Sequence, residues 1–134
     1  MNQINVLTKL DTIRQELHCQ QQKILSLEEA ARYLSPAGES IGSGGPSDRV
    51  GKIASQIADE RSKLEELEER YSNAVTDAAQ ILERLSDPLE KEVLTIRYIA
   101  GGKWEEVAKK VDCAVSTCYR IQRRAIKNVQ KVDS

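Results

Sequence analysis

Large aromatic residues are scarce in this 134-residue chain: it has no phenylalanine, and aromatics make up 4% of its residues. Aromatic side chains supply much of the apolar area of thick globular cores, so their scarcity favours helices that pack along narrow seams. Alternating runs of β-branched or aromatic residues are missing as well, which argues against β-sheet. We therefore expect an all-α fold.

Residues for metal or redox chemistry are also few. The three cysteines, Cys19, Cys113 and Cys118, are odd in number and lack the paired spacing of a disulfide framework or a zinc site. His18 is the single histidine, whereas a structural zinc site takes four ligands. No paired carboxylates or nucleophile–base set stands out. We expect no enzyme activity, no cofactor and no metal, and we expect buried thiols at positions 113 and 118.

The chain has no long apolar run and no signal-peptide pattern, so we expect a cytoplasmic protein without membrane contact. Its net charge is −1, but the charge is unevenly distributed. Residues 1–84 hold 10 basic and 14 acidic residues (net −4), and residues 85–134 hold 10 basic and 7 acidic residues (net +3). Segments this short also differ by chance, but the asymmetry is typical of a DNA-binding module joined to an acidic partner domain. We predict two domains, 1–84 and 85–134.

Two stretches of the N-terminal domain carry heptad repeats, which predict two long helices in a hairpin or coiled coil. The first repeat runs through residues 3–34, where only Gln20 interrupts the apolar seam, and the second runs through residues 52–85, where Glu60 does so. The first seam comprises Val6, Leu10, Ile13, Leu17, Gln20, Ile24, Leu27, Ala31 and Leu34. The second comprises Ile57, Glu60, Leu64, Leu67, Tyr71, Ala74, Ala78, Ile81 and Leu85.

Four glycines and two prolines between positions 35 and 48 predict a loop at residues 35–49, with Ser47 or Asp48 as the N-cap of the second helix. Its glycines lack the Lys-Ser/Thr ending and the preceding strand of a phosphate-binding loop. Such a loop allows a hairpin within one chain or pairing between chains. Apolar residues outside the strict seams, such as Leu25 and Tyr33, favour a homodimer over a monomeric hairpin.

The C-terminal domain opens with a strong helix start. Asp87 suits the N-cap, Pro88 suits the first helical position, and Glu90 is expected to complete a capping box. Gly101 and Gly102 are expected to end this helix.

A short helix, a turn and a basic helix follow. The short helix is marked by the apolar residues Trp104, Val107, Ala108 and Val111, of which we expect Trp104 to be a core residue. Residues 112–114 are expected to form the turn. The inward positions of the last helix are Cys118, Ile121, Ala125 and Val129. A helix-turn-helix that reads DNA has its parts in this order, because its last helix lies in the major groove.

The outward side chains of the last helix predict the DNA contacts. Arginine can donate two parallel hydrogen bonds to a guanine edge, and both Lys and Arg neutralise phosphates. Residues near the start of the helix suit base edges, and later residues suit phosphates. The first group comprises Ser116, Thr117, Tyr119 and Arg120, and the second comprises Arg123, Arg124, Lys127 and Lys131. The alternative is a solvated basic face on an ordinary three-helix unit.

Three stretches between residues 85 and 129 carry a family likeness: Leu-Ser-Asp-Pro-Leu-Glu-Lys-Glu-Val-Leu-Thr-Ile-Arg-Tyr, Trp-Glu-Glu-Val-Ala and Arg-Arg-Ala-Ile-Lys-Asn-Val. They resemble region 4 of bacterial sigma factors. With its linker at residues 42–49, the whole chain is similar to small phage and prophage proteins, and to phage late-gene activators of the ArpU type. The resemblance implies a bacterial host, reading of a promoter −35 element and contact with RNA polymerase. Ala114 departs from the motif, which has a Ser or Thr cap there, and this weakens the helix start by roughly 1 kcal/mol.

The likeness does not extend to a complete sigma factor. Promoter melting needs exposed aromatics that capture unstacked bases, and the first 84 residues hold only Tyr33 and Tyr71. We therefore expect a transcriptional regulator that binds duplex DNA without opening it. Two rival interpretations stay open: the DNA-recognition small subunit of a phage terminase, and an interaction protein that binds polymerase and never touches DNA.

Overall fold

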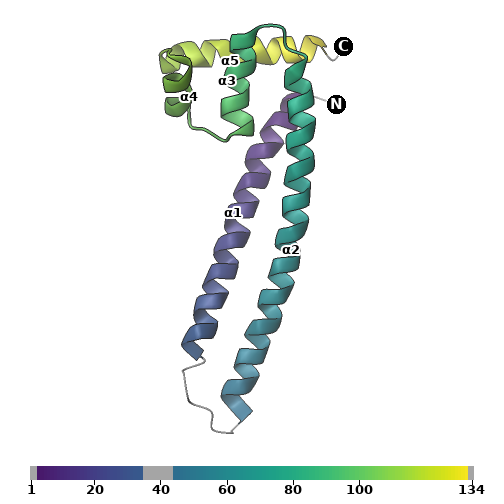
Figure 1. The fold of residues 1–134 in the computed structure, drawn as a ribbon, viewed down its shortest axis with the longest axis vertical. Helices are drawn as coiled ribbons and strands as arrows, with labels where there is room; N and C mark the ends of the chain where they lie inside the picture. Colours follow the sequence, from purple (N-terminus) through teal and green to yellow (C-terminus); the bar gives the residue numbers. More distant parts are fainter. Residues whose placement is uncertain (1–2, 35–43, 133–134) are drawn as a thin grey trace. The chain divides into compact units, whose positions relative to one another are not determined.

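The computed structural model describes residues 3–34 and 44–132, and every regular element within these ranges is helical (Figure 1). The elements are α1 (Gln3–Leu34), α2 (Gly44–Glu83), α3 (Pro88–Leu94), the π-helical turn η1 (Thr95–Ile99), α4 (Trp104–Val111) and α5 (Val115–Val132). The all-α prediction is confirmed, with a long α1–α2 hairpin followed by a smaller helical part. No described helix is long and apolar enough to cross a membrane.

The chain forms two compact units. Residues 15–69 make up the first, which we call the hairpin unit; residues 1–14 and 70–134 make up the second, which we call the C-terminal unit. The C-terminal unit therefore contains the first turns of α1 and the last turns of α2 as well as the three short helices and η1.

In the hairpin unit the two polar interruptions of the heptad seams meet each other. The Gln20 Nε2 donates to the Glu60 carboxylate at 2.7 Å and to the Glu60 carbonyl oxygen at 2.9 Å. Lys23 and Lys63 each place their Nζ 3.3 Å from the same carboxylate. The Gln20 hydrogen bond, supported by both lysines, holds the pKa of Glu60 below its ordinary value against the opposing effect of burial. A paired polar position of this kind specifies the register of two packed helices.

The start of α2 differs from the prediction. The helix begins at Gly44, so residues 44–49 are helical and neither Ser47 nor Asp48 is the N-cap. Pro46 is compatible with this early start because the first-turn amides of a helix have no intrahelical acceptor. The rest of the predicted loop, residues 35–43, lies outside the described residues.

Buried residues from both long helices belong to the C-terminal unit. They are Leu7, Leu10 and Ile13 of α1, and Ala74, Ala78 and Leu82 of α2. The short helices add a cluster of Val93, Val107, Cys118 and Ile121, with Leu89, Ile96, Trp104, Ala108, Val111 and Cys113 packed around it. Leu7 and Leu82 stand outside the heptad seams, so the periodicity of the hairpin did not predict their burial.

The expected first helix of the C-terminal part is divided into α3 and η1. Asp87 is the N-cap and accepts from the Leu89 amide at 2.9 Å, and Pro88 is the first helical residue, both as predicted. The prediction that Glu90 completes a capping box is wrong, because its carboxylate binds the last helix instead. The Ala100 amide reaches back five residues to the Thr95 carbonyl, which widens the helix into a π turn.

Candidate nucleic-acid interface

The α4–turn–α5 segment has the order of elements predicted from the sequence: a short helix, a tight turn and a longer helix. Asp112 ends α4 in the left-handed conformation (φ 56°), which aspartate tolerates better than most residues, and its amide donates to the Ala108 carbonyl. Helix α5 then begins at Val115. Its inward positions are buried as predicted: Cys118, Ile121, Ala125 and Val129.

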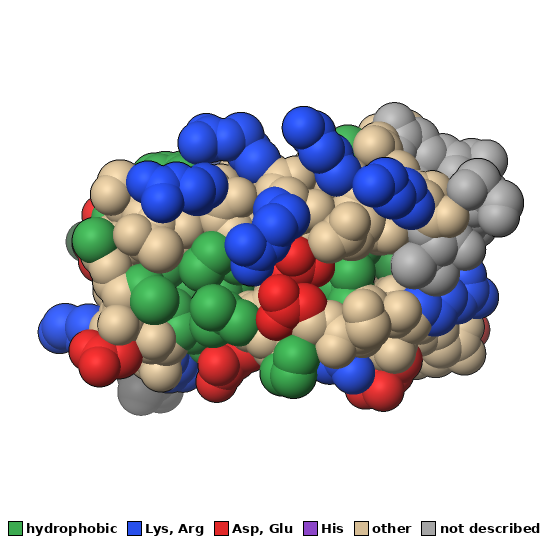
Figure 2. Space-filling model, turned by 90° about the horizontal axis from the view of Figure 1, so that it is seen from above, with side chains coloured by type: hydrophobic (Ala, Val, Ile, Leu, Met, Phe, Trp, Pro, Cys, Tyr) green, Lys and Arg blue, Asp and Glu red, His purple; other side chains and the backbone are tan. Residues whose placement is uncertain are grey.

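The opposite face of α5 carries the predicted contact residues. Those exposed are Ser116, Tyr119, Arg120, Arg123, Arg124, Lys127 and Lys131, and Thr117 is half-buried. Figure 2 shows Lys and Arg side chains gathered along one side of this end of the molecule, beside a hydrophobic area. The geometry thus separates an apolar core face from a cationic outer face on a single helix.

The arginines of this face have different surroundings. Within the described residues, Arg120, Arg123 and Lys127 have no acidic partner. Arg124, in contrast, donates through Nε to the Glu90 carboxylate at 2.6 Å and lies 3.3 Å from Asp87. The side chain of Arg124 therefore joins α5 to α3 and to its N-cap.

Tyr119 is the aromatic member of the outer face and is 40% exposed. Its ring packs on Trp104 at the start of α4, with centroids 4.7 Å apart and planes inclined by 42°. The distance between the ring centroids lies within the range of interacting aromatic pairs. Trp104 is half-buried against the apolar cluster, which agrees with its predicted core role.

Behind Trp104 lies a charged pair that the sequence analysis missed. The guanidinium carbon of Arg97 is 5.5 Å from the Trp104 ring centroid and 5.2 Å from that of Tyr98. Both terminal nitrogens of Arg97 reach the Asp11 carboxylate of α1, at 3.3 and 3.4 Å. Asp11 falls between heptad positions, so the periodicity of α1 gave no signal that it has a partner 86 residues away.

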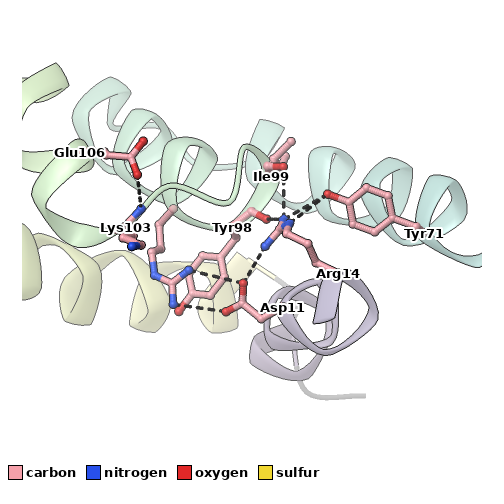
Figure 3. Close-up of polar contacts among 8 residues, drawn as sticks. Asp11, Arg14, Tyr71, Tyr98, Ile99, Lys103 and Glu106 are labelled. Carbon is pink, nitrogen blue, oxygen red and sulfur yellow. Dashed lines mark hydrogen bonds and ion pairs between the residues drawn. The ribbon is translucent and has the colours of Figure 1, made fainter. Parts of the chain in front are cut away.

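Asp11 also holds a second arginine, Arg14, through a 2.8 Å ion pair (Figure 3). Arg14 in turn donates to the Tyr98 carbonyl at 2.7 Å and so caps the end of η1. Gly101 follows with φ 76°, and a Cβ there would lie 2.8 Å from the Arg14 guanidinium. The positive φ at position 101 favours glycine, and a side chain there would also require the flexible end of Arg14 to shift.

A family model described as "Protein of unknown function (DUF1492)" matches residues 39–130, well over half of the chain. The chain belongs to the DUF1492 family. Within the described residues the match takes in α2, α3, η1, α4 and nearly all of α5 of this DUF1492 protein. No curated protein and no solved structure matches it.

Two further cations of the DUF1492 protein lie next to the turn. Lys109 and Lys110 are exposed in the last turn of α4, and neither has an acidic partner within the described residues. In a helix-turn-helix the helix before the turn crosses the phosphate backbone. Two adjacent lysines at the end of a predicted helix were a signal in the sequence. The pattern of the last helix, on which the prediction of contact residues was based, does not include them.

The thiols near the turn are structural. Cys118 is completely buried, and burial, reinforced by the neighbouring Cys113, raises its pKa. Cys113 is half-buried against the same apolar cluster. A thiol that stays protonated is a poor nucleophile and a poor metal ligand, so Cys118 acts as a small apolar core residue.

Proposed function

We propose that this DUF1492 protein is a phage-type transcriptional regulator that binds duplex DNA through α4, the turn and α5, and that it does not melt promoters. The observation that carries the proposal is the outer face of α5. Its cations Arg120, Arg123 and Lys127 have no acidic partner within the described residues, while the opposite face of the same helix is core. Cations that the fold does not use are available to phosphates and guanine edges.

The resemblance of residues 85–129 to sigma factor region 4 supports the same proposal and extends it to RNA polymerase as a second partner. The short helix α4, the turn at Asp112 and the eighteen-residue α5 have the order that this mode of binding needs. In this proposal the first turns of α5, where Ser116 and Tyr119 are exposed, supply base-edge contacts, and its later turns supply phosphate contacts.

Pairing of two copies belongs to the proposal as well. Tyr33 is 87% exposed and Leu25 is 56% exposed, both on α1 outside the hairpin seam. Two-fold pairing would place two recognition helices on successive half-sites of an inverted repeat.

The deciding experiment is selection from a random-sequence duplex pool at physiological salt, followed by sequencing of the retained DNA. A recovered motif establishes sequence-specific binding, and an inverted repeat establishes the dimer. Retention of no DNA by the folded protein refutes the proposal and favours a purely protein-binding role.

Two variants then separate base reading from phosphate binding. Arg120→Ala is expected to lose sequence preference, whereas Lys127→Ala should weaken binding to all duplexes alike and lower the salt slope by about 1. Lys52→Ala, which removes an exposed cation of the hairpin unit, is the control and should change neither property. Equal and negligible effects of Arg120→Ala and Lys127→Ala contradict the groove assignment.

A further inference from the structure

Four side chains of the C-terminal unit form a continuous chain of contacts from α1 to the outer face of α5. The Asp11 carboxylate holds the Arg97 guanidinium through two oxygen–nitrogen contacts, and Arg97 lies over the Trp104 ring. Trp104 packs on Tyr119. A two-pronged pairing of carboxylate and guanidinium fixes the plane of the guanidinium as well as its position. The Tyr119 ring is therefore oriented by Trp104 of α4 and, through Trp104, by Arg97 and Asp11, which lie outside the helix-turn-helix.

We propose that Tyr119 reads thymine through its ring and that Asp11, acting through Arg97 and Trp104, positions it. This inference rests on the DNA-binding function proposed above and assigns one specificity-determining residue within it. Asp11 itself touches no base: it is a positioning residue on the first helix of the chain.

The surroundings of Tyr119 favour a base over a phosphate as its partner. The ring is 40% exposed and lies on the same face as Arg120 and Arg123, in the first half of α5. Side chains at the start of a recognition helix reach base edges. Thymine is the base that offers an apolar group, its 5-methyl, in the major groove. An aromatic ring held in one orientation suits that methyl, because little rotamer freedom is left to lose on binding.

The proposal separates sequence preference from overall affinity. Tyr119 is not a Lys or Arg side chain and releases no counterions from phosphates, so its loss leaves the salt dependence of binding unchanged. Burial of one methyl group corresponds to roughly a fourfold change in affinity. The effect is thus measurable by replacing a single thymine with uracil, which lacks only the methyl.

The DNA experiment compares the selected duplex with versions in which each thymine in turn is replaced by uracil. For the wild-type protein, one replacement is expected to weaken binding roughly fourfold. Tyr119→Ala should bind the thymine and uracil versions equally, while Tyr119→Phe, which keeps the ring, should behave as the wild type. If replacing each thymine by uracil weakens the binding of Tyr119→Ala as much as it weakens the binding of the wild type, the reading role is overturned.

The positioning role is tested by Asp11→Asn, which keeps the side-chain shape but removes the charge. It should reduce the thymine–uracil difference while leaving the salt slope unchanged. Asp77→Asn, which removes an exposed carboxylate of the same unit, is the matched control. Asp11→Glu restores the charge and should recover part of the difference. A full thymine–uracil difference in Asp11→Asn overturns the positioning role.

Trp104 is the single tryptophan of the protein, so its fluorescence reports this contact chain without any DNA. Asp11→Asn should change the emission and the acrylamide quenching of Trp104, and Asp77→Asn should not. Helical content by circular dichroism separates this local change from unfolding; if Asp11→Asn loses helicity, Asp11→Glu takes its place. Unchanged Trp104 emission refutes the positioning even if DNA binding is established. If no DNA is retained, the DNA-binding function and the reading role fail together, while the fluorescence result still decides the contact chain.

Discussion

The neighbouring residues Arg123 and Arg124 of α5 have different roles, because only Arg124 contacts the buried Glu90 carboxylate. Glu90 is 2% exposed, and its carboxylate is satisfied by Arg124 at 2.6 Å and by Asn128 at 2.9 and 3.0 Å. A buried carboxylate that loses its cation is left with uncompensated charge. Arg124 therefore stabilises the packing of α5 on α3, whereas Arg123 is exposed and has no acidic partner in the described part of the chain.

Arg124→Ala is expected to lower the free energy of unfolding by about 2 to 3 kcal/mol, because it leaves Glu90 with Asn128 as its remaining partner. Arg123→Ala, one residue away and without an acidic partner among the residues that the structure describes, should change it by less than about 0.5 kcal/mol. Urea denaturation followed by circular dichroism measures both. Equal losses in the two variants would show that the Glu90 contact contributes no net stability.

At the scale of the element, the weak point of α5 is its beginning. The Cys118 amide donates to the Ala114 carbonyl at 3.0 Å, so Ala114 occupies the N-cap position. An alanine side chain has no acceptor for the free amides of the first turn. The departure from the sigma region 4 motif at this position therefore leaves a helix start without a side-chain cap.

Ala114→Ser is expected to raise the free energy of unfolding by about 1 kcal/mol, because the hydroxyl can accept a first-turn amide hydrogen bond. Ala54→Ser, the same substitution at an exposed interior position of α2, should instead lower it by about half that amount. Thermal and urea denaturation of both variants give the comparison. Effects of the same sign at the two positions would contradict the capping explanation.

At the scale of the whole molecule, the Gln20–Glu60 pair determines how the hairpin aligns. Apolar heptad seams alone permit other registers and pairing with other chains, and a polar pair excludes the alternatives that would bury it without a partner. The two lysines beside Glu60 add charge that favours the same alignment. Specificity of this kind generally costs stability.

Replacing Gln20 and Glu60 together by leucine is expected to raise the melting temperature and to produce mixed oligomeric states. The added apolar burial stabilises helix pairing but no longer selects one register. Gln20→Leu alone should lower the melting temperature, because it removes the hydrogen bonds that Gln20 donates to the carboxylate and the carbonyl oxygen of Glu60. Circular dichroism and light scattering coupled to size exclusion measure the two properties. A single, unchanged oligomeric state in the double variant would contradict the register role.

Local patterns accounted for much of the fold and for part of the candidate interface. The heptad spacing predicted the two long helices and part of their buried faces, but not the burial of Leu7 and Leu82. Asp87 and Pro88 predicted the start of α3, and the helical period of α5 predicted which residues face the core. These succeed because caps and periodicity involve residues only a few positions apart. The start of α2 was missed because Gly44 to Pro46 have the composition of a loop, although a first helical turn also tolerates it.

The sequence by itself thus determined which helices form, which of their faces are apolar and where the cations of α5 lie. Only the tertiary structure decided what the polar side chains between those faces do. Glu90 binds Arg124 rather than its own helix start, and Asp11 holds Arg97 behind the Trp104–Tyr119 pair. The physical reason is that these contacts join residues tens of positions apart. Their geometry depends on which helix surfaces meet, and no local spacing in the chain encodes that.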